Sequence, residues 1–378
     1  MLNTITTPPK KPRLAAIEYI RGVSMLGVIG IHVGSQYLMN PSANIHLVAL
    51  FETVTRFAVP IFFFISAFGL FYNLDTSKPF DYPAFLRRRF KSVLVPYLFW
   101  SALYILHDTL YYNFGFPPLG YLLKLFFFGL AKYHLYFLVI LLWFYLLMPI
   151  WIAIVRSVNA SELLILLVVQ TAFNYVSSYS SALSAFTYSL PEDSLLRWLL
   201  EYRLNYLVLH YVFVFVLGGY LAVHSKEFLK FMQRHRPAIT LTFLLSLAAL
   251  LCHYYFLILV RHLPPEAAVN TAHQLSPIGI IYTVTASVFF FSLFTFTLTD
   301  SPLLRLLGRH SYFVYLFHPF VIFYLHPLMD KLNLVLTAPN AIIFYFVTAT
   351  VSLIVAVLVR TLGKRYTPLN ELTIGSKV

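Results

Sequence analysis

A cation and an imidazole lie inside the first long apolar segment of the sequence, residues 14–38. Arg21 and His32 are separated by ten residues, which at about 100° per residue puts both side chains on one face of a helix. At ~1.5 Å per residue they lie roughly 16 Å apart along the axis, too far apart to touch. An Arg at the centre of a membrane helix costs roughly 2.5–3.5 kcal/mol, and such residues usually face a polar interior where they have a function. One helix therefore presents a cation at one depth of the membrane and an imidazole at another, and both are candidate functional groups.

Four further ionisable residues are weaker candidates for binding a substrate. Glu18 lies one turn before Arg21, where the two side chains can also pair with each other. Arg56 lies in the second apolar segment and His134 at the start of the fourth, and both have a structural alternative at the membrane interface. His318 lies in the middle of the ninth apolar segment and precedes a proline, which favours a position on a cavity wall.

A basic cluster directly precedes the third apolar segment. It contains Arg87, Arg88, Arg89 and Lys91. Arg side chains bind phosphate oxygens in a bidentate manner, so the functional interpretation is a phosphate site. The alternative is a signal for topology with contacts to lipid phosphates. We predict no metal site, because the histidines have no Asp, Glu or Cys at the spacing of metal ligands.

The composition indicates an integral membrane protein. Of the 378 residues 60% are hydrophobic and only 11% are charged, whereas soluble domains have about a quarter charged residues. The single cysteine, Cys252, excludes an internal disulfide. The net charge of +13 does not indicate nucleic-acid binding, because the basic residues fall in the short loops where they determine topology.

The apolar segments predict an all-α polytopic protein with ten transmembrane spans and both termini in the cytoplasm. With this topology 19 Lys and Arg residues lie inside, 6 lie outside and 2 lie within spans, which agrees with the positive-inside rule. A shorter apolar patch at 119–131 is expected to be a re-entrant or interfacial helix. We expect cytoplasmic tails at 1–13 and 363–378 and one transmembrane domain at 14–362. The predicted spans are 14–38, 47–73, 92–113, 133–155, 160–178, 205–224, 237–260, 277–299, 306–327 and 340–362.

The arrangement of these motifs resembles the membrane acyltransferase-3 family, in which an Arg, ten residues and a His mark the first span. Similar motifs follow in the family's order: RFAVPIFFFISAFG in span two, RRRFKSVLVPYL at span three, YHLYFL in span four and SYFVYLFHPF in span nine. The Arg-x-x-Arg pair of the family is altered here, to Arg88 with Lys91 or Arg89 with Ser92. Length and layout look like the stand-alone bacterial O-acyltransferases and the proteins that modify intercellular polysaccharide adhesin.

The resemblance implies an enzyme of a bacterial cell membrane that takes an acyl group, usually acetyl, from cytoplasmic acyl-CoA. The acceptor would be a hydroxyl accessible from outside, usually of a glycan. The resemblance assigns the general-base role to His32, orientation of the donor to Arg21, and binding of its phosphates to the cluster at 87–91. A covalent acyl-His intermediate fits the same residues.

Two other classes of function fit the same segments. A transporter or flippase for a glycan or small solute also has many helices with buried charges, although the paired broken helices of inverted repeats are not apparent. A non-catalytic membrane partner in polysaccharide assembly is the third class. The sequence leaves open the acceptor, the choice between acetyl and succinyl, and the oligomeric state.

Overall fold

The protein is an all-helical bundle in the computed structural model, which describes residues 14–40, 43–75 and 78–376. No strand occurs in these ranges. The tail expected at 1–13 lies outside them. The long helices are α1 (Ala15–Leu38), α3 (Ala58–Asn73), α5 (Val95–Tyr111), α9 (Ala160–Tyr179), α15 (Arg236–Leu259), α17 (Pro277–Phe296), α18 (Pro302–Lys331) and α19 (Ala338–Arg365). The shorter helices are α2 (Ile45–Val48), α4 (Tyr82–Arg89), α6 (Leu119–Phe128), α7 (Tyr136–Leu146), α8 (Met148–Ser157), α10 (Ser181–Ser189), α11 (Leu195–Glu201), α12 (Arg203–Tyr206), α13 (Val212–Val223), α14 (Ser225–Arg234), α16 (Pro265–Thr271) and α20 (Thr367–Ile374).

The prediction of a polytopic membrane fold is confirmed. Within the described ranges, eight helices are long and apolar enough to cross a membrane, and two bent pairs raise the number to ten. The bent pairs are α7 with α8, at 68°, and α13 with α14, at 95°. The span expected at 205–224 is therefore not one continuous helix, because α13 begins only at Val212. At ~1.5 Å per residue its 12 residues cover roughly 18 Å of a hydrocarbon core about 30 Å thick.

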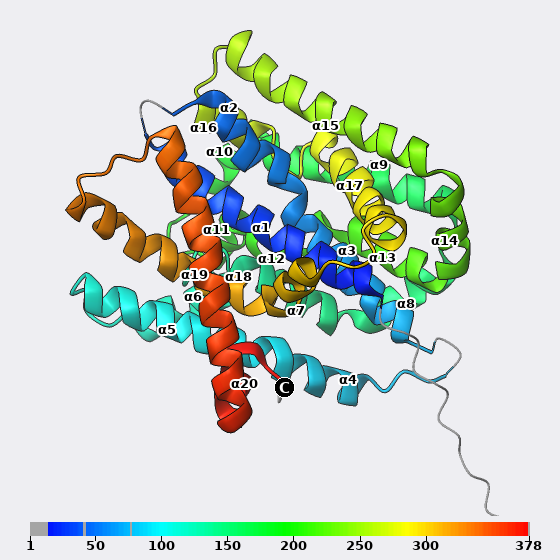
Figure 1. The fold of residues 1–378 in the computed structure, drawn as a ribbon, viewed down its shortest axis with the longest axis horizontal. Coiled ribbons are helices and arrows are strands. Elements are labelled where there is room, and N and C mark those ends of the chain that lie inside the picture. The colour runs from blue at the N-terminus through cyan, green and yellow to red at the C-terminus, as the bar shows by residue number, and fades with distance from the viewer. Residues whose placement is uncertain (1–13, 41–42, 76–77, 377–378) are drawn as a thin grey trace, which may run out of the picture.

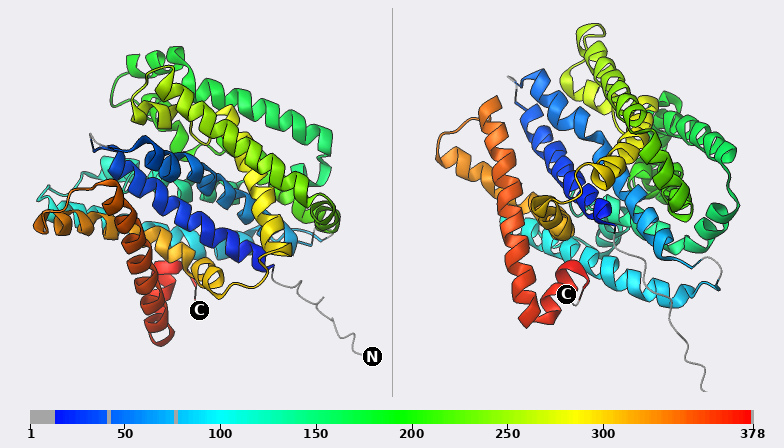
Figure 2. Two further views of the ribbon diagram at one scale, coloured as in Figure 1. Left: turned by 45° about the horizontal axis from the view of Figure 1, so that its top comes forward. Right: turned by 45° about the vertical axis from the view of Figure 1, so that its right-hand side comes forward.

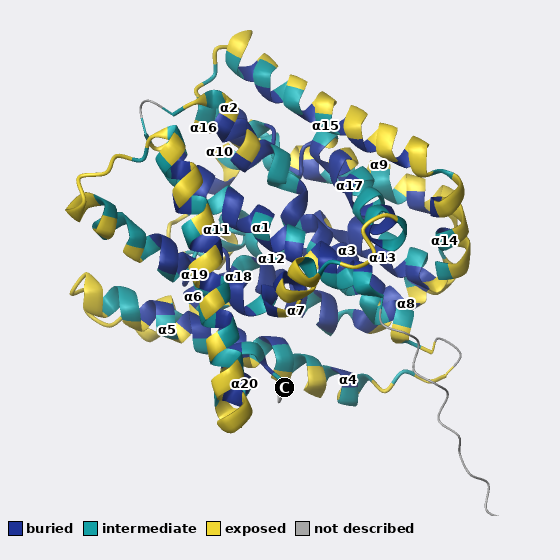
Figure 3. Cartoon of the chain, viewed as in Figure 1, coloured by how far each residue is buried: buried dark blue, intermediate teal, exposed yellow. Residues whose placement is uncertain are grey.

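Helix α1 runs through the middle of the bundle, where it packs against α18 and α3 (Figure 1 and Figure 2). Figure 3 shows that buried positions concentrate on α1, α3 and α13, whereas α9, α15 and α19 expose long rows of residues. The exposed rows are apolar, for example Val168, Leu245 and Ile354. An apolar outer surface is what a helix needs in order to face lipid, so α9, α15 and α19 form the outside of the bundle around α1.

Two glycines bring α1 and α18 into backbone contact. A Cβ atom added at Gly308 would lie 1.9 Å from the carbonyl oxygen of Glu18, and one at Gly22 would lie 3.0 Å from Cβ of Leu307. Small residues at such crossings allow membrane helices to pack closely. This contact holds α18, which contains His318, against α1, which contains Arg21 and His32.

We expect Gly308→Ala to destabilise the protein, because the added methyl group would clash with backbone atoms of Glu18, which cannot move aside as a flexible side chain could. Overpacking of this kind costs roughly 1–3 kcal/mol. The measurement is the midpoint of thermal unfolding in detergent. Gly120→Ala in α6 is the matched control, since a Cβ atom there would meet nothing within 4 Å. Equal midpoints for both variants would contradict the close contact of α1 with α18.

Helix irregularities precede two prolines in the second and third spans. The π-helical turn η1 (Ala49–Thr53) and the 3₁₀ turn η2 (Val54–Phe57) lead into α3, which contains Pro60. The π-helical turn η3 (Phe90–Leu94) leads into α5, which contains Pro96. Proline has no N–H to donate to the preceding turn, and π turns are frequent at functional sites. The ion pair of Glu52 with Arg56 lies in the first of these irregular stretches.

The segment expected to be a C-terminal tail, 363–378, carries a packed helix in its described part. Helix α19 continues to Arg365, and α20 follows and folds back onto α5 (Figure 1). Trp100 Nε1 donates to the carbonyl oxygen of Thr373 at 3.0 Å, and Lys91 Nζ lies 3.0 Å from Glu371 Oε1. The C-terminal helix is therefore part of the bundle.

One end of the bundle gathers the basic residues, and we call it the basic face. The start of α1 meets the start of α18 there, through the contact of Glu18 with Gly308. Arg360 of α19 donates to the carbonyl oxygen of Arg309 at 3.0 Å. The other end, at Asn40 and Leu336, is called the opposite face; Asn40 Nδ2 donates to the Leu336 carbonyl oxygen at 3.0 Å. Basic residues at this end include Arg21, Arg87, Arg88, Arg89, Lys91, Arg305, Arg309, Arg360, Lys364 and Arg365.

Candidate active site

A histidine layer lies between the two faces, in the interior of the bundle. The ring of His32 stacks on the ring of His318 with 5.3 Å between centroids and 21° between planes. The ring of His134 lies 5.4 Å from that of His318, and the ring of Tyr133 lies 4.5 Å from that of His32. Three of the sequence-predicted residues, from three separate segments, therefore meet at one point. We call His32, His134 and His318 the histidine layer.

The hydrogen bond of His318 defines its tautomer. Its Nδ1 lies 3.1 Å from the carbonyl oxygen of Val314, one turn earlier in α18. A carbonyl oxygen only accepts, so Nδ1 carries the proton and donates it. Nε2 of His318 and both ring nitrogens of His134 are buried and have no hydrogen-bond partner among the described residues. Buried polar atoms are normally paired, so these nitrogens have free capacity for a hydrogen bond to an ordered water or a ligand.

The loop that carries Tyr133 and His134 depends on a glycine at its start. Gly129 ends α6 in a left-handed conformation with φ of +70°. A Cβ atom there would lie 2.6 Å from Cα of Tyr136, so the turn into α7 admits only glycine. The hydroxyl of Tyr315 then donates to the carbonyl oxygen of His134, which joins this loop to α18.

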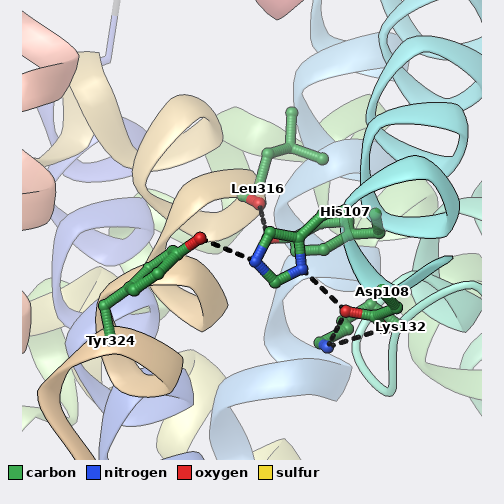
Figure 4. A network of polar contacts seen from close by, with 6 residues as sticks. His107, Asp108, Lys132, Leu316 and Tyr324 are labelled. Carbon is green, nitrogen blue, oxygen red and sulfur yellow. Dashed lines mark hydrogen bonds and ion pairs between the residues drawn. The ribbon is translucent and has the colours of Figure 1, made fainter. Parts of the chain in front are cut away.

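A polar network anchors the same loop from its other side (Figure 4). His107 Nδ1 lies 2.8 Å from Asp108 Oδ1, and His107 Nε2 lies 2.9 Å from the hydroxyl oxygen of Tyr324. Lys132, the residue before Tyr133, places its Nζ 3.2 Å from Asp108 Oδ2. The network thus ties the loop to α5 and α18 and positions the aromatic residues beside His32.

The opposite-face cavity reaches the histidine layer from one side. Its volume is about 380 Å³, and His32, Tyr133 and the ion pair of Glu52 with Arg56 line it. The ion pair has a distance of 3.0 Å between Nη2 and Oε2 and is almost fully buried. Ser35, one turn after His32, donates to Glu52 Oε1 at 2.7 Å. A polar pocket with a histidine at its wall suits a ligand that carries hydroxyl groups.

The basic-face chamber reaches toward the layer from the other side. It comprises two adjoining cavities of about 260 and 240 Å³, both lined by Arg21, Arg89 and Tyr145. Glu18 lines the second of them. The chamber therefore combines two guanidinium groups with one carboxylate, and its net charge favours an anionic ligand.

The predicted basic cluster divides in the structure. Arg89 lines the chamber, and its guanidinium lies 5.4 Å from the ring centroids of both Phe85 and Tyr145. Its Nε is buried and has no hydrogen-bond partner among the described residues. Arg87 and Arg88 are exposed and line neither of its two cavities, and Lys91 pairs with Glu371.

Tyr315 connects the chamber to the histidine layer. It lines the larger chamber cavity, and its ring lies 5.0 Å from His134 and 6.3 Å from His318. On the far side of the layer, Tyr133 lines the opposite-face cavity. The two cavities therefore approach the same histidines from opposite faces of the bundle.

Sequence reasoning missed three residues of this site. Tyr315 and Tyr145 line the chamber, and Tyr133 lies against His32. Tyr133 is adjacent to His134 and Tyr315 lies one turn before His318, so their positions beside motif residues were the available signal, whereas Tyr145 had none. Among the described residues no group of three His, Cys, Asp or Glu side chains has the geometry of a metal site.

The fold and the site together define a polytopic membrane protein with ionisable side chains gathered in its interior. The chain matches the family described as "acyltransferase domain", the acyltransferase-3 family, over residues 14–361, and it belongs to that family. Neither the curated proteins nor the solved structures contain a significant match to it.

Proposed function

We propose that this protein is an O-acyltransferase that moves an acetyl group from acyl-CoA at the basic face to a hydroxyl at the opposite face. The acceptor is a glycan of the cell surface, and the basic face is cytoplasmic because Lys and Arg residues are retained on that side. The observation that carries the proposal is the stacked pair of His32 and His318 between a cationic chamber and a polar cavity.

The dimensions of the chamber fit the donor. The pantetheine arm of CoA has roughly 12 bonds between diphosphate and sulfur, which span about 14 Å at the rise of an extended peptide. Arg21 and His32 lie roughly 16 Å apart along α1. A diphosphate bound by Arg21 and Arg89 therefore brings the thioester to the level of the histidine layer.

The proposed chemistry is a direct transfer. An acceptor hydroxyl in the opposite-face cavity attacks the thioester carbonyl carbon, and the carbon–sulfur bond breaks. His32 removes the hydroxyl proton and passes it to the thiolate of CoA, as a general base and then a general acid. His32 is assigned this role because it is the member of the histidine layer that lines the acceptor cavity. His318, which is fully buried, positions His32 by stacking against it.

The function is tested with purified protein and radiolabelled acetyl-CoA. We expect release of free CoA and appearance of the label on glycan fragments isolated from the cell surface. Saponification of the product should return labelled acetate, because an ester is formed. Binding or uptake of glycan without any CoA release would contradict the acyltransferase assignment and favour a transporter.

We expect His318→Ala to lower kcat for transfer about 10- to 100-fold, because His32 loses the ring that positions it. The KM for acetyl-CoA should change less than threefold, because His318 does not contact the CoA phosphates. The measurement is kcat and KM per mole of folded protein, with the folded fraction counted by CoA binding, because a loss of folded protein alone also lowers the apparent kcat at unchanged KM. His253→Ala in α15 is the control, since His253 lines neither the chamber nor the opposite-face cavity. An unchanged kcat in His318→Ala would remove the positioning role.

A further inference from the structure

A separate cavity, the side cavity, adjoins the basic-face chamber and takes no part in the proposed chemistry. It has a volume of about 160 Å³ and lies between α18, α19 and α20. Tyr312 and Ile374 line both the side cavity and the larger cavity of the chamber. The two spaces are therefore neighbours behind a shared wall of two residues.

The side cavity is cationic. Arg309 and Arg360 line it together with His310, and no Asp or Glu does. Arg360 Nη1 donates to the carbonyl oxygen of Arg309 at 3.0 Å, which holds the two residues together. Arg309 is exposed, so the cavity opens on the basic face. Paired guanidinium groups without a lining carboxylate are suited to binding phosphate.

A buried amide supplies the second, independent observation. Asn370 of α20 is fully buried, and its Nδ2 donates to the carbonyl oxygen of Arg360 at 3.3 Å. Because that carbonyl only accepts, the amide orientation is determined and Oδ1 must point elsewhere. Oδ1 has no hydrogen-bond partner among the described residues, and Asn370 lines the side cavity. The cavity thus offers a hydrogen-bond acceptor beside two cations.

Helix α20, which carries Asn370, is held in place by contacts with α5 and the segment before it. Trp100 of α5 donates to the carbonyl oxygen of Thr373, and Lys91 pairs with Glu371. Gly375 follows with φ of +66°, and a Cβ atom there would lie 2.4 Å from Cα of Ser92. The position of α20, and with it of Asn370, is therefore determined by contacts outside the side cavity.

We propose that the side cavity binds the 3′-phosphate and adenine of the CoA donor. Arg309 and Arg360 bind the phosphate, and Asn370 Oδ1 accepts a hydrogen bond from the adenine amino group. The diphosphate and the pantetheine arm then extend past Tyr312 and Ile374 into the chamber. This inference rests on the proposed function for its ligand, and it assigns the nucleotide end to residues different from Arg21 and Arg89.

The test compares the binding of CoA with that of dephospho-CoA, which lacks the 3′-phosphate, by calorimetry on the purified full-length protein. We expect the unaltered protein to bind CoA about 10- to 100-fold more tightly than dephospho-CoA, which is the affinity that one charge-assisted hydrogen bond contributes. Arg309→Gln should lower this ratio, because only Arg360 still contacts the phosphate, and should leave the affinity for dephospho-CoA unchanged. Arg365→Gln is the matched control, because Arg365 is an exposed arginine near the end of α19 that does not line the side cavity.

Two results would overturn the inference. In the first, the unaltered protein binds CoA and dephospho-CoA equally; in the second, Arg309→Gln weakens both ligands by the same factor. The measurement needs no turnover. Tight CoA binding that discriminates the 3′-phosphate but supports no acetyl transfer would sink the proposed function and leave the nucleotide site intact.

Discussion

Replacement of His32 by Ala is expected to lower the rate of acetyl transfer by a factor of 10² to 10⁴, the usual contribution of a general base. The imidazole is the proton acceptor at the wall of the opposite-face cavity, and alanine cannot take its place. His32→Gln should lose as much activity, because glutamine keeps most of the volume but has no basic nitrogen. The measurement is kcat with radiolabelled acetyl-CoA and a saturating acceptor.

The same experiment includes controls for the folding of the variants. Both His32 variants should retain the size-exclusion profile and the CoA affinity of the unaltered protein, since His32 lines neither cavity of the chamber. His253→Ala should transfer at the unaltered rate. If His32→Gln transferred acetyl within threefold of the unaltered rate, the general-base role would have to be assigned to another group.

Replacement of Arg89 by Ala is expected to raise the KM for acetyl-CoA about 10- to 100-fold while kcat changes little. The reason is that Arg89 faces the chamber with a buried Nε that has no partner among the described residues. Loss of a hydrogen bond between charged groups costs about 1.5–3 kcal/mol, and 1.4 kcal/mol is a factor of ten. Initial rates over a range of acetyl-CoA concentrations measure the effect.

Arg87→Ala provides the contrast within the same basic cluster. Arg87 is exposed and does not line the chamber, so its contribution is a weak attraction screened by salt. We expect its KM effect to stay below threefold and to vanish at high ionic strength, whereas that of Arg89→Ala persists. Equal effects of the two substitutions would show that the cluster acts as a diffuse positive surface.

The first helix illustrates what the sequence predicts well. The spacing of Arg21 and His32 depends only on helical periodicity, and α1 is a continuous helix over both residues. Accordingly, Arg21 lines the chamber and His32 lines the opposite-face cavity. Long apolar helices such as α15 and α19 are also predictable, because an apolar composition alone is enough to place a helix in lipid.

Contacts between distant segments could not be predicted in this way. From the sequence His134 is a weak substrate-binding candidate with a structural alternative at the membrane interface; in the structure its loop brings it beside His318, because Gly129 turns the chain and Tyr315 holds it. The basic cluster divides because α4 packs with Arg89 toward Tyr145 of α7 and leaves Arg87 and Arg88 exposed. The break before α13 depends on the packing of short turns, which no hydropathy pattern describes.

We propose that donor and acceptor meet at the histidine layer from opposite faces of the membrane. Sealed inverted membrane vesicles test it, because they expose the cytoplasmic face to added radiolabelled acetyl-CoA and enclose the glycan acceptor. We expect ester-linked label to accumulate on the enclosed glycan, and vesicles with His32→Gln to accumulate none. Label that appears only on acceptor added to the outside of these vesicles would contradict it.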